Sequence, residues 1–351
     1  MAAILKFPGK TKGLVCFTKQ ETSNIPSFDF LRSKWVVGLH HNWQPAYHDN
    51  RFDVSIICKN YMMTAGAPVI DAHACSYVSK YFNSSPFSQR HWDILYVARS
   101  VDFKRISVFL NSIRKVYDMG YDYRVLLIAC NGPMPADTEK CPKDLLGDYM
   151  KMFSHEERTR FNLLEMNYNY PFTFDHKTLA HFYKSSKVFT HVGNVGYWSR
   201  VASQAYAAGL SVVCYPGQST VVPEKLRKSP VTHVYNNDSE IPLRMIEAVE
   251  SYNENYDSDL FVESSNHFQP ENTFIRTKDE IRKFFQKIGI EFDSSDGFNL
   301  HNLDRRIARH VGASIGDNKV SMSINDFMKV LMSDTQFDSE SEDLEILISG
   351  G

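Results

Sequence analysis

Between residues 91 and 252, short apolar runs alternate with stretches in which apolar residues recur every three or four positions. In the stretch 105–119, Ile106, Phe109 and Ile113 fall on one helical face, and Gly120 follows where a helix end favours a left-handed residue. The apolar runs lie at 93–98, 123–130, 162–166, 188–192, 211–215 and 232–235, and the other helical stretches lie at 176–185, 199–208 and 240–252. Strands alternating with helices predict a parallel sheet covered on both faces, with ligands at the carboxyl ends of its strands.

The pattern differs on either side of this region. Residues 1–82 hold short Val- and Ile-rich runs and little helical periodicity, which predicts a short α/β domain. A polar, proline-containing connection at 83–90 predicts an inter-domain linker. After the regular domain, 91–252, amphipathic stretches predict a helical extension over 253–333. The acidic end, 334–351, has the composition of a disordered tail.

Composition narrows the class of protein. The chain has 351 residues, 43% of them hydrophobic, which suits two globular domains. Six scattered cysteines predict reduced thiols, with neither a disulfide framework nor a metal site. We find no apolar run of membrane-spanning length and no signal peptide, so we expect a cytoplasmic protein.

The net charge of −2 conceals a division along the chain. Residues 1–230 carry 28 Lys and Arg against 18 Asp and Glu, whereas residues 231–351 carry 11 against 23. This asymmetry indicates an anionic ligand or partner for the first part, although an unevenly charged solvated surface would look the same.

Two connections of the regular domain carry candidate chemistry. Arg99 leaves the first strand and Lys104 follows five positions later, so two cations converge on one crevice, as a diphosphate requires. An exposed Arg and Lys in a turn is the simpler alternative. In the loop 191–199, Gly193 and Gly196 flank Asn194 and would let backbone N–H groups approach a phosphate or a sugar. Packing of small residues would explain such a loop equally well.

The order of these segments resembles a known family. A strand, Arg99, four residues, Lys104 and a helix are followed by Leu-x-x-x-Tyr and Val-Phe, a glycine loop, and the run Gln-Ala-x-Ala-x-Gly-Leu-x-Val-Val from Gln204. This series resembles the carboxyl-terminal domain of GT-B glycosyltransferases, and more narrowly their large retaining family that uses nucleotide-sugar donors. The resemblance covers roughly residues 35–250.

The resemblance implies a fold and an activity. We expect an α/β protein of GT-B type, with two Rossmann-like domains facing a cleft, that moves a sugar from a nucleotide sugar to an acceptor hydroxyl. Arg99 and Lys104 would hold the donor diphosphate and stabilise it as a leaving group, so that neither a metal nor a cofactor is needed. Gly193, Asn194 and Gly196 would line the donor site.

The chain departs from the family at the usual pair of glutamates. Gly196 and Gln204 occupy those positions. The amide of Gln204 can still hydrogen-bond a ribose hydroxyl, but Gly196 supplies no carboxylate, which puts the retaining outcome and the activity itself in doubt. The run 36–42 resembles the loop that faces the donor sugar, so His40 or His41 would act as general base or hydrogen-bond the sugar. A structural role for either histidine remains the alternative.

The sequence does not identify the acceptor. A saccharide is the commonest acceptor among such enzymes, whereas the cationic first part would also suit a hydroxylated base in DNA. Against DNA, no helix carries a regular Lys and Arg stripe, and a pI of about 6.7 is not that of a DNA binder. A third hypothesis is a catalytically inactive scaffold that binds a partner through its acidic end.

Overall fold

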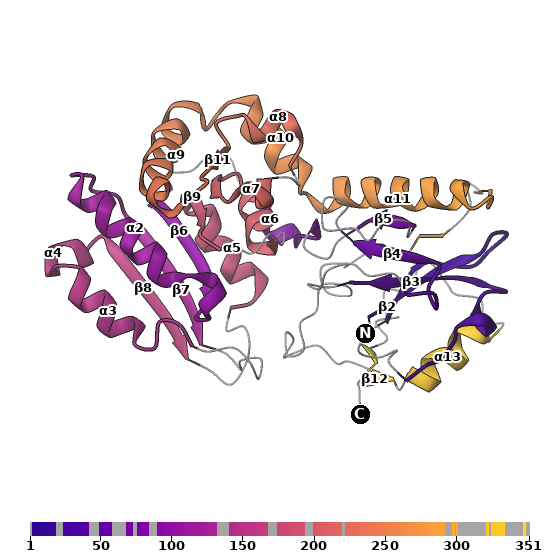
Figure 1. Ribbon diagram of the computed structural model, residues 1–351. Coiled ribbons are helices and arrows are strands. Elements are labelled where there is room, and N and C mark those ends of the chain that lie inside the picture. The colour runs from indigo at the N-terminus through magenta and orange to yellow at the C-terminus, as the bar shows by residue number, and fades with distance from the viewer. Residues whose placement is uncertain are drawn as a thin grey trace. The chain divides into compact units, whose positions relative to one another are not determined.

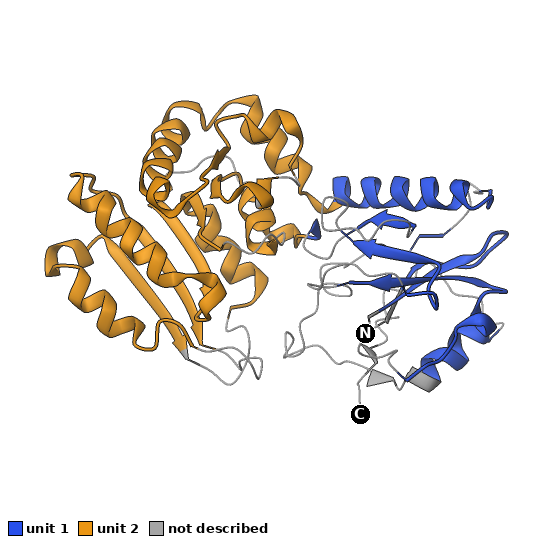
Figure 2. Cartoon of the chain, viewed as in Figure 1, with its two compact units in different colours: residues 1–77, 271–351 blue, residues 78–270 orange. Residues whose placement is uncertain are grey.

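The chain forms two compact units, one of residues 1–77 and 271–351 and the other of residues 78–270 (Figure 2). The computed structural model describes residues 2–18, 24–41, 49–57, 68–72, 76–83, 90–131, 140–167, 174–193, 199–219, 222–291, 297–298, 300, 321–322, 324–333 and 347–348.

The second unit is built on a six-stranded parallel sheet, as the alternating pattern predicts (Figure 1). Its strands are β6 (Trp92–Arg99), β7 (Val125–Asn131), β8 (Phe161–Asn167), β9 (Ser186–His191), β10 (Ser211–Cys214) and β11 (Thr232–Val234). They lie in the order β11-β10-β9-β6-β7-β8, which is the doubly wound order of a Rossmann fold. β6 and β7 are buried through most of their length, because helices cover both faces of the sheet.

Helices connect these strands and lie against the sheet. They are α2 (Ile106–Asp118), α3 (Leu145–Met152), α4 (His155–Arg158), α5 (His176–Lys184), α6 (Arg200–Ala207), α7 (Pro216–Ser219), α8 (Glu224–Arg227), α9 (Ile241–Asn255) and α10 (Asp259–His267), with 3₁₀ turns η3 (Lys80–Phe82), η4 (Asp102–Lys104) and η5 (Asp238–Glu240). α2 packs against α9, and α5 packs against α6. The predicted apolar face of α2 is buried, and Gly120 and Gly209 take the left-handed conformation with φ of 88° and 72°.

A partly buried arginine, Arg90, ties the start of this unit to α5, the start of β9 and the end of α6. The guanidinium of Arg90 donates to the carbonyl oxygens of Ser186 at 2.5 Å, Ala208 at 2.8 Å and Tyr183 at 3.4 Å. It also lies 5.5 Å from the ring centroid of Tyr252. Ala208 is the C-cap of α6, so Arg90 satisfies a carbonyl there that the helix leaves without an intrahelical partner, and it also binds the first residue of β9.

The first unit holds a five-stranded sheet in the order β1-β2-β3-β4-β5. Its strands are β1 (Ala2–Lys6), β2 (Gly13–Thr18), β3 (Trp35–His40), β4 (Val54–Ile57) and β5 (Val69–Asp71). β1 runs antiparallel to β2, and the other neighbours pair in parallel. A 3₁₀ turn, η1 (Asp29–Leu31), precedes β3.

Two helices from the carboxyl-terminal part of the chain, α11 (Pro270–Lys287) and α13 (Ile324–Met332), pack against this sheet. Each helix contacts a different set of strand residues. Leu14, Cys16, Val36 and Ile56 pack with Phe284 and Phe285 of α11. Their neighbours in sequence, Val15, Phe17, Trp35, Val37 and Leu39, pack instead with Phe327 and Leu331 of α13. This division follows the alternation of side chains along each strand.

The predicted extension 253–333 is divided in the structure. α10 packs against α6 in the second unit, whereas α11 and α13 belong to the first unit with residues 1–77. Amphipathic periodicity shows that a helix has a buried face, but it does not show which sheet covers that face. Within the predicted tail 334–351, Leu347 and Ile348 form β13, which pairs with β12 (Ser321–Met322), and the rest lies outside the described residues.

Candidate donor site

The candidate site lies where the strand order of the second unit reverses, between β6 and β9. The described ladder between these strands ends at Leu95 and Phe189, whereas β6 stays paired with β7 up to Arg99 and Cys130. The carboxyl ends of β6 and β9 therefore separate. In doubly wound sheets a ligand binds in the crevice at this reversal.

Arg99 and Lys104 lie on the connection that follows β6. Arg99 is the last residue of β6, and Lys104 is the last residue of η4. Lys104 therefore ends a 3₁₀ turn and does not open the helix as the sequence suggested, because α2 begins only at Ile106. The hydroxyl of Tyr96, on the buried part of β6, donates to the carbonyl oxygen of Lys104 and holds the turn against the strand.

A third cation, Arg105, was missed in the sequence. It links η4 to α2 in a left-handed conformation with φ of 54°. Its guanidinium donates to the carbonyl oxygen of Val192 at 3.3 Å and forms an ion pair with Asp238, the first residue of η5. Arg105 thus joins the connections after β6, β9 and β11. The sequence shows three cations between 99 and 105, but nothing in their spacing shows that Asp238 engages one of them.

His191, at the end of β9, is buried with 3% of its surface exposed. Neither ring nitrogen has a hydrogen-bond partner among the described residues. Burial, and then the charge of Lys104, lowers the pKa of His191 to about 3, so the imidazole is neutral at ordinary pH. A buried polar group without a partner costs about 1–3 kcal/mol, which calls for an explanation.

Gly193 borders the ring of His191. A Cβ at Gly193 would lie 2.9 Å from Cε1 and 3.5 Å from Nε2 of His191, and 3.5 Å from the carbonyl oxygen of Phe103. Glycine is therefore required here for space, and it brings the start of the predicted loop close to η4. Gly193 thus borders the imidazole, and Lys104 is near enough for its charge to act on the pKa of the ring.

No contact in the described part of the chain tests the roles predicted for the other donor-site residues, Gln204, Asn194 and Gly196. Gln204 is buried within α6, with 4% of its surface exposed, and its contact with a ribose stays a prediction. Asn194 and Gly196 lie outside the described residues.

The two predicted histidines of the first unit lie at the end of β3. His40 is its last residue and His41 follows, and both are buried. Nε2 of His41 lies 3.1 Å from the hydroxyl of Ser55, on β4, so His41 joins neighbouring strands. Their predicted roles toward a sugar stay predictions.

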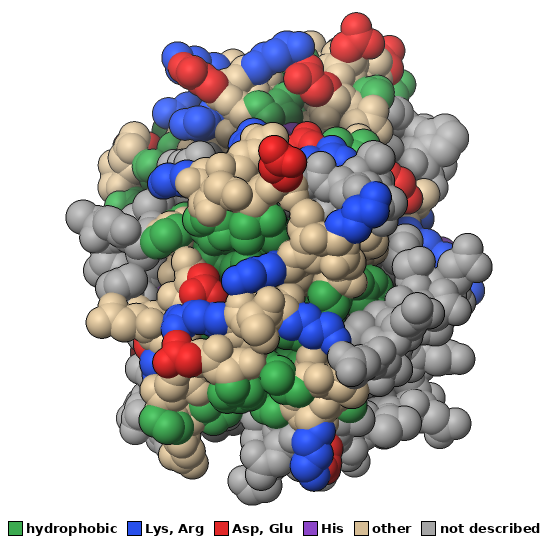
Figure 3. All heavy atoms as spheres, turned by 90° about the vertical axis from the view of Figure 1, so that its right-hand side faces the viewer, with side chains coloured by type: hydrophobic (Ala, Val, Ile, Leu, Met, Phe, Trp, Pro, Cys, Tyr) green, Lys and Arg blue, Asp and Glu red, His purple; other side chains and the backbone are tan. Residues whose placement is uncertain are grey.

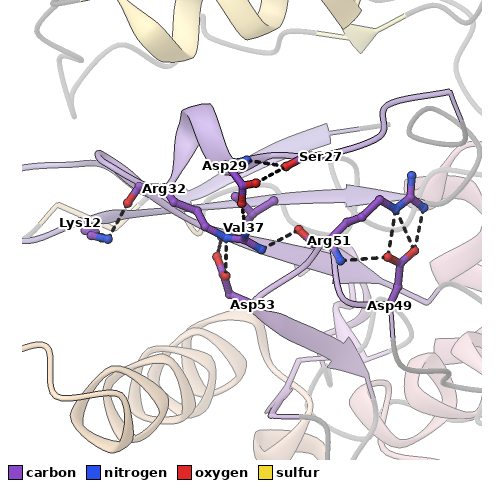
Figure 4. Close-up of polar contacts among 8 residues, drawn as sticks. All are labelled: Lys12, Ser27, Asp29, Arg32, Val37, Asp49, Arg51 and Asp53. Atoms are coloured by element: carbon purple, nitrogen blue, oxygen red, sulfur yellow. Dashed lines mark hydrogen bonds and ion pairs between the residues drawn. The ribbon is translucent and has the colours of Figure 1, made fainter.

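An ion-pair network fixes the return from β3 to β4 (Figure 4). Arg51 pairs with Asp49 at 2.6 Å, and Arg32 donates to Asp53 at 2.9 Å. The other carboxylate oxygen of Asp53 accepts from the backbone N–H of Val37 at 2.8 Å. These contacts hold the amino end of β4 against β3, so they have a structural role.

Among the described residues, we find no group of three or more His, Cys, Asp and Glu side chains that could hold a metal ion. None of the helices described is both long enough and apolar enough to cross a membrane.

Several solved structures resemble part of the chain at low sequence identity. The pneumococcal O-GlcNAc transferase GtfA, solved with UDP and GlcNAc, is 9% identical with a TM-score of 0.49, over 73% of this chain and 53% of GtfA. The α,α-trehalose 6-phosphate synthase of Burkholderia multivorans is 11% identical with a TM-score of 0.47, over 74% of this chain and 68% of the synthase. Sucrose-phosphate synthase of Thermosynechococcus elongatus is 13% identical with a TM-score of 0.48, over 74% of this chain and 70% of that enzyme.

The chain thus spans about half the length of GtfA, 53%. No protein-family model matches the chain, and no curated protein sequence matches it.

Proposed function

We propose that the chain is a glycosyltransferase whose second unit binds a nucleotide sugar at the carboxyl ends of β6 and β9. The observation that carries this proposal is the reversal of strand order there, with Arg99 and Lys104 on the connection after β6. Gly193 begins the connection after β9, beside the same turn. Two cations and a glycine at such a crevice suit a diphosphate.

In the proposed reaction, an acceptor hydroxyl oxygen forms a bond to the anomeric carbon of the sugar. The bond from that carbon to the phosphate oxygen breaks, the nucleoside diphosphate leaves with the bonding electrons, and the hydroxyl proton passes to a base. Arg99 and Lys104 stabilise the charge that develops on the diphosphate, which requires no metal ion. Arg105 holds the turn that presents Lys104, because its own charge is paired with Asp238.

The remaining roles follow from the same proposal. Gln204 hydrogen-bonds a ribose hydroxyl, since an amide both donates and accepts. His40 or His41, both buried at the end of β3, serves as the base or contacts the sugar. The nucleotide sugar acts as a co-substrate, and the protein requires no further cofactor.

We propose a saccharide as the acceptor. DNA recognition calls for a cationic surface that follows the phosphate backbone. On the face drawn in Figure 3, the described Lys and Arg side chains stand among acidic and apolar ones and form no continuous stripe. Binding of a saccharide acceptor requires no such cationic surface.

A thermal-shift screen with nucleotides and nucleotide sugars tests the proposal. A ligand at about 100 times its dissociation constant stabilises the fold by about 2.7 kcal/mol. We expect at least one nucleotide sugar to stabilise the wild type but not Arg99→Ala/Lys104→Ala. The control Lys115→Ala/Arg124→Ala removes the same charge from exposed positions of the second unit and should respond like the wild type. If no nucleotide moves the wild type, the proposal fails.

A further inference from the structure

His191 is the feature of the second unit that packing explains least. It is buried at the end of β9, where the sheet reverses, and both of its ring nitrogens lack a partner among the described residues. Leucine or phenylalanine would fill a buried strand position without that cost. A polar group kept there points to a partner that joins it only in another state of the protein.

The surroundings of the ring indicate what that partner is. Cε1 and Nε2 form the edge that faces Gly193, and the carbonyl oxygen of Phe103 borders the same space. Lys104 is close enough for its charge to lower the pKa of the imidazole. Because the carbonyl of Phe103 borders this edge and Lys104 is the next residue, an anion bound at this turn would come close to the ring, where a neutral imidazole can donate one hydrogen bond.

We propose that His191 directly recognises the bound nucleotide, through a hydrogen bond from its neutral imidazole to an oxygen of the diphosphate beside Lys104. This inference rests on the proposed function. Both nitrogens are enclosed in the described structure, so the contact forms when the backbone at Gly193 or Phe103 shifts as the diphosphate binds. Gly193 suits such a shift because it has no side chain to move out of the space.

The inference predicts opposite effects on stability and on binding. His191→Leu removes the unsatisfied nitrogens, so the unliganded protein should unfold at a higher temperature. The same variant should bind inorganic pyrophosphate, which has the diphosphate but no base, about 10-fold more weakly, the effect of one hydrogen bond. His191→Gln, which keeps a donor, should stay within about 3-fold of the wild type.

Thr190→Val is the matched control. Thr190 is also buried, and its hydroxyl has no partner within the described part of the chain, but as the neighbour of His191 along the strand it lies on the opposite face of the sheet. Its replacement should raise stability and leave pyrophosphate binding unchanged.

Imidazole nitrogen NMR of the wild type gives a second readout that does not depend on the folding of a variant. We expect the His191 ring nitrogens, assigned by the signal lost in His191→Gln, to shift when pyrophosphate is added. If the wild type binds pyrophosphate or a nucleoside diphosphate but the His191 signals do not move and His191→Leu binds equally well, the inference is overturned. If the wild type binds neither, the proposed function fails instead.

Discussion

Replacement of Arg90 by alanine should destabilise the second unit strongly. Its guanidinium makes two close hydrogen bonds, to Ser186 at 2.5 Å and Ala208 at 2.8 Å, and a long one to Tyr183 at 3.4 Å. Hydrogen bonds to charged groups contribute about 1.5–3 kcal/mol each, so the two close ones account for about 3–6 kcal/mol. Part of this sum is offset because burial disfavours the charged guanidinium and lowers the pKa of Arg90. We therefore expect a net loss of about 3 kcal/mol in the free energy of unfolding.

Hydrogen exchange followed by mass spectrometry in urea measures this loss, because peptides from β6 and β9 report on the second unit separately from the first. Arg90→Lys should fall between alanine and the wild type, since an ammonium cannot reproduce the fork of a guanidinium. Arg124→Ala, at an exposed position on the same sheet, should change stability by less than about 0.5 kcal/mol. A loss below about 1 kcal/mol in Arg90→Ala would refute the reasoning, because the carbonyls of Ser186 and Ala208 would then not depend on Arg90.

Three further predictions concern packing, pH and the donor site. Phe285→Ala should lower the free energy of unfolding of the first unit by about 3–5 kcal/mol in urea unfolding. Ile275→Ala, at an exposed position of the same helix, should lower it little. Similar losses in the two variants would show that α11 does not cover the sheet. Hydrogen bonding from Arg114 lowers the pKa of Glu157 to about 2, below its usual 4.5. The ionised Glu157 therefore contributes to the free energy of unfolding above pH 4.5, and this contribution is lost as the pH falls towards 2. We expect that contribution to be about 1 kcal/mol after solvent screening, and Glu157→Gln, unlike the exposed Glu156→Gln, should abolish it in unfolding midpoints measured across that range. Gly193→Ala should lose about 1–3 kcal/mol of stability and also bind pyrophosphate more weakly, because its Cβ would meet the His191 ring at 2.9 Å; unchanged values would contradict that packing.

The sequence predicts most of the second unit because its signals are local. The apolar face of α2 and the glycines after α2 and α6 can be recognised from spacing alone. The first unit is predicted less completely. The run of α11 shows a helix, but its partners are strands more than 200 positions earlier in the chain, and no local pattern encodes that contact.

In the candidate site, too, residues marked by local sequence signals could be predicted, and residues whose role depends on distant contacts could not. Arg99, Lys104 and Gly193 follow strands that periodicity identifies, so they could be named beforehand. Arg105 could not, because its role depends on Asp238, which is distant in sequence. His191 lies within the predicted apolar run 188–192, and only the arrangement around Gly193 and Lys104 distinguishes it from a histidine packed in a core.

Isothermal titration calorimetry with ADP, GDP, UDP and dTDP tests the central claim most directly. We expect at least one of them to bind the wild type and Lys115→Ala/Arg124→Ala with the same affinity. Arg99→Ala/Lys104→Ala should bind that nucleotide about 100-fold more weakly, because it lacks two charge-assisted contacts. Equal affinity in all three proteins, or no binding by the wild type, would contradict a diphosphate site at the carboxyl ends of β6 and β9.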